Sequence, residues 1–173
     1  MFVQANERNT FAERFCYFPL IQNKLKSTFM NAQLTPRWSR LVKTEEIETP
    51  KYFIDCYVCP VDFDELRENH LDEPPVLYAF AVFDHNNKYL LSYALEMRKA
   101  VRIKEDETEE EYIGYFLETY CEHQRFSCKN FKDVEPDFES VRTMVIQFVV
   151  EYDAVEKMLE YDRESARERE EKS

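Results

Sequence analysis

Alternation of apolar and polar residues in the middle of the chain predicts an antiparallel sheet. Residues 52–59 (YFIDCYVC) are rich in β-branched and aromatic side chains and are followed by Pro60, as expected for a strand. Two further apolar runs, 76–83 and 88–95, flank the sequence Asp-His-Asn-Asn, where asparagine accepts the left-handed backbone of a tight hairpin turn. Residues 99–104 alternate as well. The pattern therefore predicts three or four antiparallel strands in the centre of the chain.

Helical periodicity predicts helices on both sides of this sheet. A capping box at residues 10–13 predicts a short helix over about 11–18, and an apolar stripe beginning at Pro19 predicts a second helix that ends before Pro36. Residues 37–50 are expected to form a loop or an extended connector. A second capping box at 108–111 precedes an apolar stripe that predicts a helix over 112–121, with Gly114 inside it.

The final predicted helix begins near Pro136 and carries a regular apolar seam. Its residues are spaced alternately three and four apart, as in the heptad seam of a coiled coil: Phe138, Val141, Val145, Phe148, Tyr152, Val155 and Leu159. Such a seam can pack in the core of the chain or be offered to a partner, and both uses can coexist on one helix. Residues 162–173 continue as alternating Arg and Glu, which predicts a frayed or disordered tail.

These elements predict an α+β fold. A single domain over residues 1–161 would hold a central antiparallel sheet of three to four strands, packed by N-terminal helices and two C-terminal helices. A chain of 173 residues with 44% hydrophobic residues is long and apolar enough to bury such a core.

Composition narrows the possible chemistry. The chain has one glycine, Gly114, so it cannot form the Walker phosphate loop, the dinucleotide-binding turn or the nucleophile elbow of the hydrolases, each of which needs several glycines. The net charge is −12, and residues 105–173 hold 21 acidic against 9 basic residues, which accounts for the whole excess. Direct nucleic-acid binding is not expected, because a basic face is missing.

The cysteine content and the hydropathy of the chain predict the location of the protein in the cell. The chain has five cysteines, and its polar first ten residues do not have the pattern of a signal peptide, so an intracellular location in the cytoplasm or nucleus is expected. No apolar run is long enough to cross a bilayer, and no membrane association is expected.

Two groups of residues have side chains suited to a metal or catalytic site. Cys56 and Cys59 have metal-ligand spacing, and Cys121, His123 and Cys128 could complete a zinc site. Residues three apart on a strand point to opposite faces, however, so buried structural thiols are the favoured interpretation and no cofactor is expected. Asp62, Asp64 and Glu65 could bind a hard cation, and His70 could take part in catalysis with them, but a solvated acidic turn is the simpler interpretation. His85 lies in the predicted hairpin turn, where it is expected to be solvated.

The sequence thus favours a non-catalytic interaction protein: a subunit, adaptor or inhibitor. We expect it to bind another protein, or a second copy of itself, through the seam residues of the long helix and through an aromatic surface, since the chain has 11 tyrosines and 14 phenylalanines. The alternative is an acidic nucleic-acid mimic, such as a viral or phage counter-defence protein, that inhibits a DNA- or RNA-binding enzyme by placing carboxylates where phosphates would bind.

Overall fold

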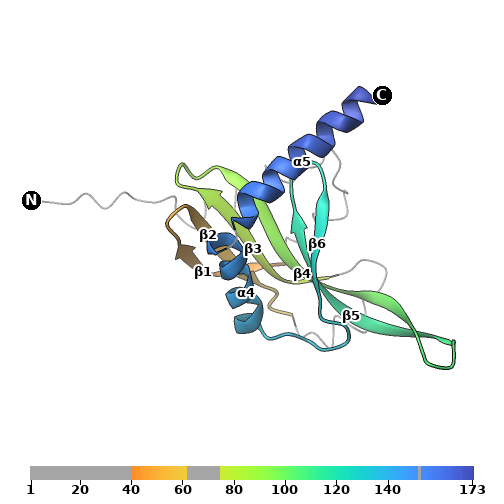
Figure 1. Ribbon diagram of the computed structural model, residues 1–173. Helices are drawn as coiled ribbons and strands as arrows, with labels where there is room; N and C mark the ends of the chain where they lie inside the picture. The colour runs from red at the N-terminus through yellow and green to blue at the C-terminus, as the bar shows by residue number, and fades with distance from the viewer. Residues whose placement is uncertain (1–39, 62–74, 152) are drawn as a thin grey trace, which may run out of the picture.

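The computed structural model describes residues 40–61, 75–151 and 153–173. They form an α+β structure in which one antiparallel sheet is covered on one face by two helices (Figure 1). The six strands follow one another along the sheet in chain order: β1 Val42–Glu48, β2 Tyr52–Val58, β3 Val76–Asp84, β4 Tyr89–Ile103, β5 Glu109–Tyr120 and β6 Arg125–Asn130. The helices are α4, Phe138–Val150, and α5, Ala154–Glu171.

The predicted α+β class is confirmed and two C-terminal helices are present, but they are not the two predicted over 112–121 and from Pro136, and the number of strands differs. The structure has six strands instead of three or four. β2, β3 and the first part of β4 lie where the alternation placed strands, with Asn87 at φ 61° in the turn between β3 and β4. The predicted strand at 99–104 is a continuation of β4, and β1 lies in the segment expected to be a loop or an extended connector. The helices expected before Pro36 lie outside the described residues.

The helix predicted over 112–121 is wrong, because residues 112–120 belong to β5. All twelve residues of β5 pair with β4, from Glu109 opposite Ile103 to Tyr120 opposite Ser92. Tyrosine, phenylalanine, isoleucine and threonine make up half of this strand and favour an extended backbone. The helical stripe in the sequence arose because the last seven residues of β5 are buried on both faces of the sheet, so their hydrophobicity does not alternate.

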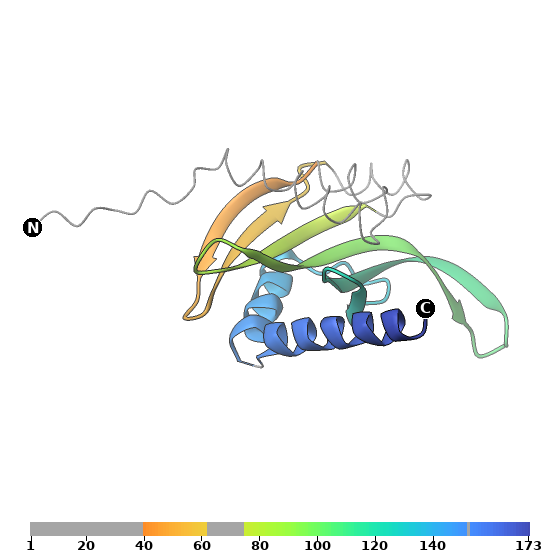
Figure 2. The same ribbon diagram turned by 90° about the horizontal axis from the view of Figure 1, so that it is seen from above.

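Stacked aromatic rings join the helices to the sheet. Phe138 of α4 stacks on Phe80, with ring centroids 5.8 Å apart, and Phe148 stacks on Tyr93 at 6.1 Å. On α5, Tyr161 packs against Phe126 of β6 at 5.4 Å. Figure 2 shows both helices on the same side of the sheet. The core lies between these helices and β2–β5.

The long helix predicted from Pro136 is two helices. Asp137 caps α4 by accepting a hydrogen bond from the Ser140 amide at 2.8 Å, and the helix ends at Val150. Asp153 then adopts the left-handed conformation with φ 47°, and α5 starts in a new direction. No glycine or proline marks this break in the sequence.

Polar contacts fix α5 along the sheet. Lys51, in the turn between β1 and β2, pairs with Asp153 at 3.2 Å and with Glu156 at 3.1 Å. Farther along, Asp162 is 2% exposed and accepts a hydrogen bond from the His123 amide at 3.1 Å. α5 continues to Glu171, so most of the segment expected to be a frayed tail is helical.

Candidate functional site

A two-stranded arm extends from the end of the sheet (Figure 1). The pairing of β3 with β4 reaches only as far as Glu96, and the pairing of β6 with β5 ends at Phe116. Beyond these residues β4 and β5 continue to pair with one another up to Ile103 and Glu109. We call residues 99–113 the arm. An isolated pair of strands is only marginally stable, so this part of the chain depends on side-chain contacts for order.

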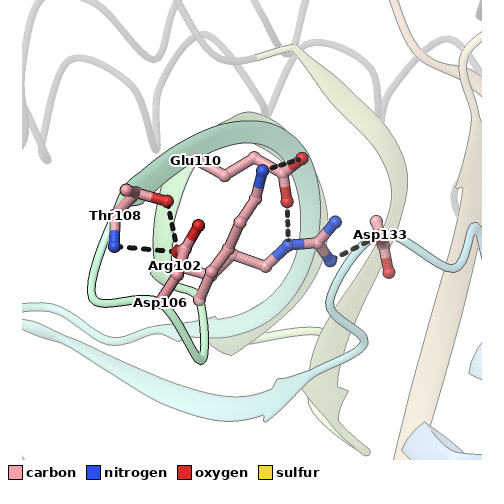
Figure 3. Close-up of polar contacts among 6 residues, drawn as sticks. Arg102, Asp106, Thr108, Glu110 and Asp133 are labelled. Atoms are coloured by element: carbon pink, nitrogen blue, oxygen red, sulfur yellow. Dashed lines mark hydrogen bonds and ion pairs between the residues drawn. The ribbon is translucent and has the colours of Figure 1, made fainter.

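One face of the arm is stabilised by an ion-pair network around Arg102 (Figure 3). The Arg102 guanidinium donates to Glu110, which lies directly opposite on β5, at 2.5 Å, and to Asp133, in the segment after β6, at 2.8 Å. Lys104 pairs with the other oxygen of Glu110 at 3.3 Å. The guanidinium also lies 5.2 Å from the centre of the Tyr112 ring, within the range of a cation–π contact. The cations on this face are therefore already paired.

These contacts shift the pKa values of the two carboxylates that pair with Arg102. Hydrogen bonds from Arg102 and Lys104 lower the pKa of Glu110, and a hydrogen bond from Arg102 lowers the pKa of Asp133. A carboxyl group whose pKa is lowered by folding stabilises the folded state above its unfolded pKa. This contribution is lost as the pH falls through the folded pKa. These two ion pairs therefore contribute more to the stability of the folded arm at neutral pH than in acid.

The tip of the arm turns without glycine. Lys104 donates its amide to the Thr108 carbonyl at 2.9 Å, and Glu107 takes the left-handed conformation with φ 63°. Asp106 accepts hydrogen bonds from the Thr108 amide at 3.1 Å and from its hydroxyl at 2.5 Å (Figure 3). Thr108 thus closes a hairpin and does not cap a helix, which corrects the capping box expected at 108–111.

The opposite face of the arm is apolar and acidic. The side chain of Val101 is 56% exposed and that of Ile103 is 74% exposed. In the strand register Val101 lies opposite Glu111, and Ile103 lies opposite Glu109. Both glutamates are solvent-exposed. Neither forms an ion pair with another residue in the described ranges 40–61, 75–151 and 153–173. This face therefore places two aliphatic side chains beside two carboxylates at the end of an extended element.

Gly114 lies where the arm joins the sheet. A Cβ atom at this position would come within 2.7 Å of Phe116 and 3.1 Å of Tyr112, so both rings occupy the space that a side chain would need. The Arg98 guanidinium, on the residue opposite Gly114, lies 4.0 Å from the centre of the Phe116 ring. The four left-handed residues among those described are Asn87, Glu107, Lys132 and Asp153, so this glycine provides space and not a positive φ.

Buried charges lie next to this junction. Arg98 donates to Glu118 at 2.9 Å and lies 3.8 Å from Glu96. Glu96 is fully buried and Glu118 is 3% exposed. Burial raises the pKa of Glu118, the Arg98 charge opposes that rise, and the neighbouring Glu96 adds to it. Arg98 therefore lies beside two carboxylates that are buried in the folded chain.

The seam residues expected to bind a partner lie between α4, α5 and the sheet. Val141, Val145 and Val155 are fully buried, while Phe138, Phe148 and Leu159 are half-buried and pack on the same core. The side chain of Tyr152 lies outside the described residues. In this structure the three valines cannot reach a partner without opening the fold. The surface-exposed residues of the arm were not singled out by the sequence, although the alternation of Val101 and Ile103 with Arg102 and Lys104 was the signal for them.

The cysteines and histidines among the described residues lie apart from the arm. Cys56, Cys59 and Cys121 are buried, Cys128 is half-buried, and all four are free thiols. The Cys128 sulfur lies 2.7 Å from the Thr119 hydroxyl, and the His85 ring is 2.9 Å from the Pro50 carbonyl. Within the described segments, no three His, Cys, Asp or Glu side chains are grouped so that they could hold a metal ion. Asp62, Asp64, Glu65 and His70 lie outside those segments.

Cys56 and Cys121 are expected to resist alkylation by iodoacetamide at about pH 8 in the folded protein. Burial raises the pKa of each thiol to about 12, and the thiolate is the reactive form. Mass spectrometry of the labelled peptides, with and without urea, measures the effect. Equal labelling rates in buffer and in urea would contradict the burial of these side chains.

No protein-family model, curated protein or solved structure matches this chain. Neither α4 nor α5, the two helices in the described part of the chain, is long and apolar enough to cross a membrane.

Proposed function

We propose that this chain is a non-catalytic binding protein and that the arm, residues 99–113, is its principal contact with a partner protein. The observation that carries the proposal is the exposure of Val101 and Ile103 at the end of an element held in shape by the Arg102 network. Aliphatic side chains so exposed on a projecting ribbon add nothing to the core of the chain. Side chains of this kind provide contact area to a partner, and the ordered arm lowers the entropy lost when it binds.

The free energy gained by burying Val101 and Ile103 limits how much these two side chains contribute to binding. Complete burial of a valine or isoleucine side chain contributes about 1.5–3 kcal/mol, and here each side chain is already partly covered. Association costs roughly 4–15 kcal/mol in lost translational and rotational freedom. Two aliphatic side chains cannot offset that cost alone, so the charged groups of the arm and further surface must also take part.

Shortening the arm tests this proposal. Residues 101–111 are replaced by Asn-Gly, which forms a two-residue hairpin turn and removes both exposed aliphatic side chains and the acidic tip. We expect the variant to keep its circular dichroism spectrum, because the deleted residues lie outside the core. We also expect it to lose the proteins that the full chain captures from an extract of its own organism.

The matched control replaces Glu164 and Glu168, both exposed on α5, with glutamine. This control should capture the same proteins as the full chain. Light scattering on both variants shows whether a second copy of the chain is the partner. Equal capture by the full and shortened chains would refute the proposal.

A nucleic-acid mimic is the second candidate, and the tip of the arm favours it. Six of the seven residues 105–111 are acidic, and they project from the sheet at the end of a narrow ribbon. Binding through carboxylates alone should weaken steeply between about 50 and about 500 mM salt, because exposed charges are screened over a few ångströms at the higher concentration. Binding that also buries Val101 and Ile103 should keep most of its strength over that range.

A further inference from the structure

The two faces of the arm differ in how their charges are satisfied. On the face that carries Arg102 and Lys104, both cations are paired with Glu110, and Arg102 is also paired with Asp133. On the face that carries Val101 and Ile103, Glu109 and Glu111 form no ion pair with any of the described residues. Only the second face thus offers charges that a partner can neutralise.

The register of the hairpin arranges this second face as two rows. Val101 and Ile103 form an apolar row on β4, and Glu111 and Glu109 form an acidic row directly opposite on β5. Residues opposite one another in an antiparallel pair have Cβ atoms about 4.5–5.5 Å apart. A partner that covers both rows must place apolar side chains next to cationic ones at the same spacing.

The charge of this face also excludes several classes of partner. Glu105 and Glu107, both exposed in the turn at the tip, add two carboxylates near this face, and Lys99 is the one cation that the described strands place on it. Carboxylates in this arrangement repel phosphates, which opposes a nucleic acid or an anionic membrane. They also repel an identical acidic face, which opposes docking of two copies through their arms.

We infer that the face of the arm formed by Val101, Ile103, Glu109 and Glu111 docks onto a basic amphipathic protein segment. This inference rests on the proposed function and names the chemistry of the partner. The apolar side chains of that segment lie on Val101 and Ile103, and its lysine or arginine side chains pair with Glu109 and Glu111. The ordered arm presents both rows before binding, so the segment adapts to the arm.

Defined peptides test the inference on the full-length chain. The probe is a fluorescein-labelled 18-residue amphipathic peptide of leucine and lysine, with a leucine–glutamate peptide and a serine–lysine peptide as comparisons, and binding is followed by fluorescence anisotropy. The leucine–lysine peptide should bind, and the two comparison peptides should bind at least about tenfold more weakly, because each lacks one of the two complementary rows.

Variants separate specific docking from attraction to an acidic protein. V101S/I103S and E109Q/E111Q should each raise the Kd for the leucine–lysine peptide by about tenfold or more. E164Q/E168Q removes the same charge from α5 and should change that Kd by less than about twofold. E109K/E111K should reverse the preference, so that the leucine–glutamate peptide binds more tightly than the leucine–lysine peptide.

The outcomes distinguish this inference from the proposed function. Equal effects of E109Q/E111Q and E164Q/E168Q, or equal binding of the three peptides, would overturn the inference. If shortening the arm still abolishes capture of the native partner in that case, the proposed function stands and only the chemistry assigned to the partner is wrong. If the shortened chain captures the partner as well as the full chain does, the proposed function fails.

Discussion

Replacing Arg98 with methionine is expected to lower the free energy of unfolding by about 3 kcal/mol, the lower end of the range for breaking a buried ion pair. The Arg98 side chain is 28% exposed, whereas the side chains of Glu96 and Glu118, its two partners, are 0% and 4% exposed. Methionine keeps an apolar contact with Phe116 but removes the positive charge. Two carboxylates then lie close together on the sheet without the arginine that offsets their repulsion.

The loss of unfolding free energy in the Arg98→Met variant should depend on pH. Arg98 opposes the rise that burial causes in the pKa of Glu118, so its removal raises that pKa further. A carboxyl group whose pKa is raised by folding destabilises the folded state as the pH rises from its unfolded value through its folded value. The difference in free energy of unfolding between the variant and the native chain should therefore be large near pH 7.5 and shrink toward about pH 4. Urea denaturation at both pH values measures it.

A second substitution provides the control. Glu118→Gln in the Arg98→Met background removes one of the two buried charges and should recover part of the lost stability at neutral pH. The loss of unfolding free energy could instead be the same at both pH values and not be reduced by Glu118→Gln. That result would show that Arg98 acts through packing on Phe116 and not through its charge.

Gly114→Val is expected to destabilise the chain by about 1–2 kcal/mol, although valine is the better residue for a strand. The gain in strand propensity is at most about 1 kcal/mol. Against it, the new side chain would meet the Phe116 ring at 2.7 Å and the Tyr112 ring at 3.1 Å in a buried position, and overpacking typically costs 1–3 kcal/mol. Displacing Phe116 would also remove the ring that lies under Arg98.

A double-mutant cycle checks the cause of the Gly114→Val effect. Phe116→Leu removes the far end of the ring and makes room for valine, so the double variant should be less destabilised than the sum of the two single variants. Lys99→Val introduces the same residue at an exposed position of β4 and should leave stability nearly unchanged. Additive effects of the two substitutions would contradict the proposed clash.

The strands that sequence patterns located best are those with a clear turn between them. Asparagine at 86 and 87 between two apolar runs identified the β3–β4 hairpin, because few residues tolerate a left-handed backbone. The β4–β5 hairpin was missed because its turn uses Glu107 in that role. Glutamate gives no turn signal, and three glutamates after a threonine resemble the start of a helix.

The candidate site was less predictable than the fold. The seam at 138–159 had the strongest pattern in the chain, yet Val141, Val145 and Val155 lie in the core. A heptad pattern indicates which side chains are buried. Burial in the core of the same chain produces this pattern as well as burial against a partner does. The exposure of Val101 and Ile103 depends instead on where the pairing of β3 and β6 ends, which a pattern within β4 does not encode.

The sequence by itself determined the α+β class, the β3–β4 hairpin, a helix beginning just after Pro136 and the concentration of acidic residues after position 104, because each depends on local preference or on composition. Tertiary structure alone decided that residues 109–120 are a strand, that the long helix breaks at Asp153, and that Gly114 lies beneath two aromatic rings. These features depend on contacts between residues far apart in the chain, and for β5 the pairing with β4 outweighs the local helical pattern.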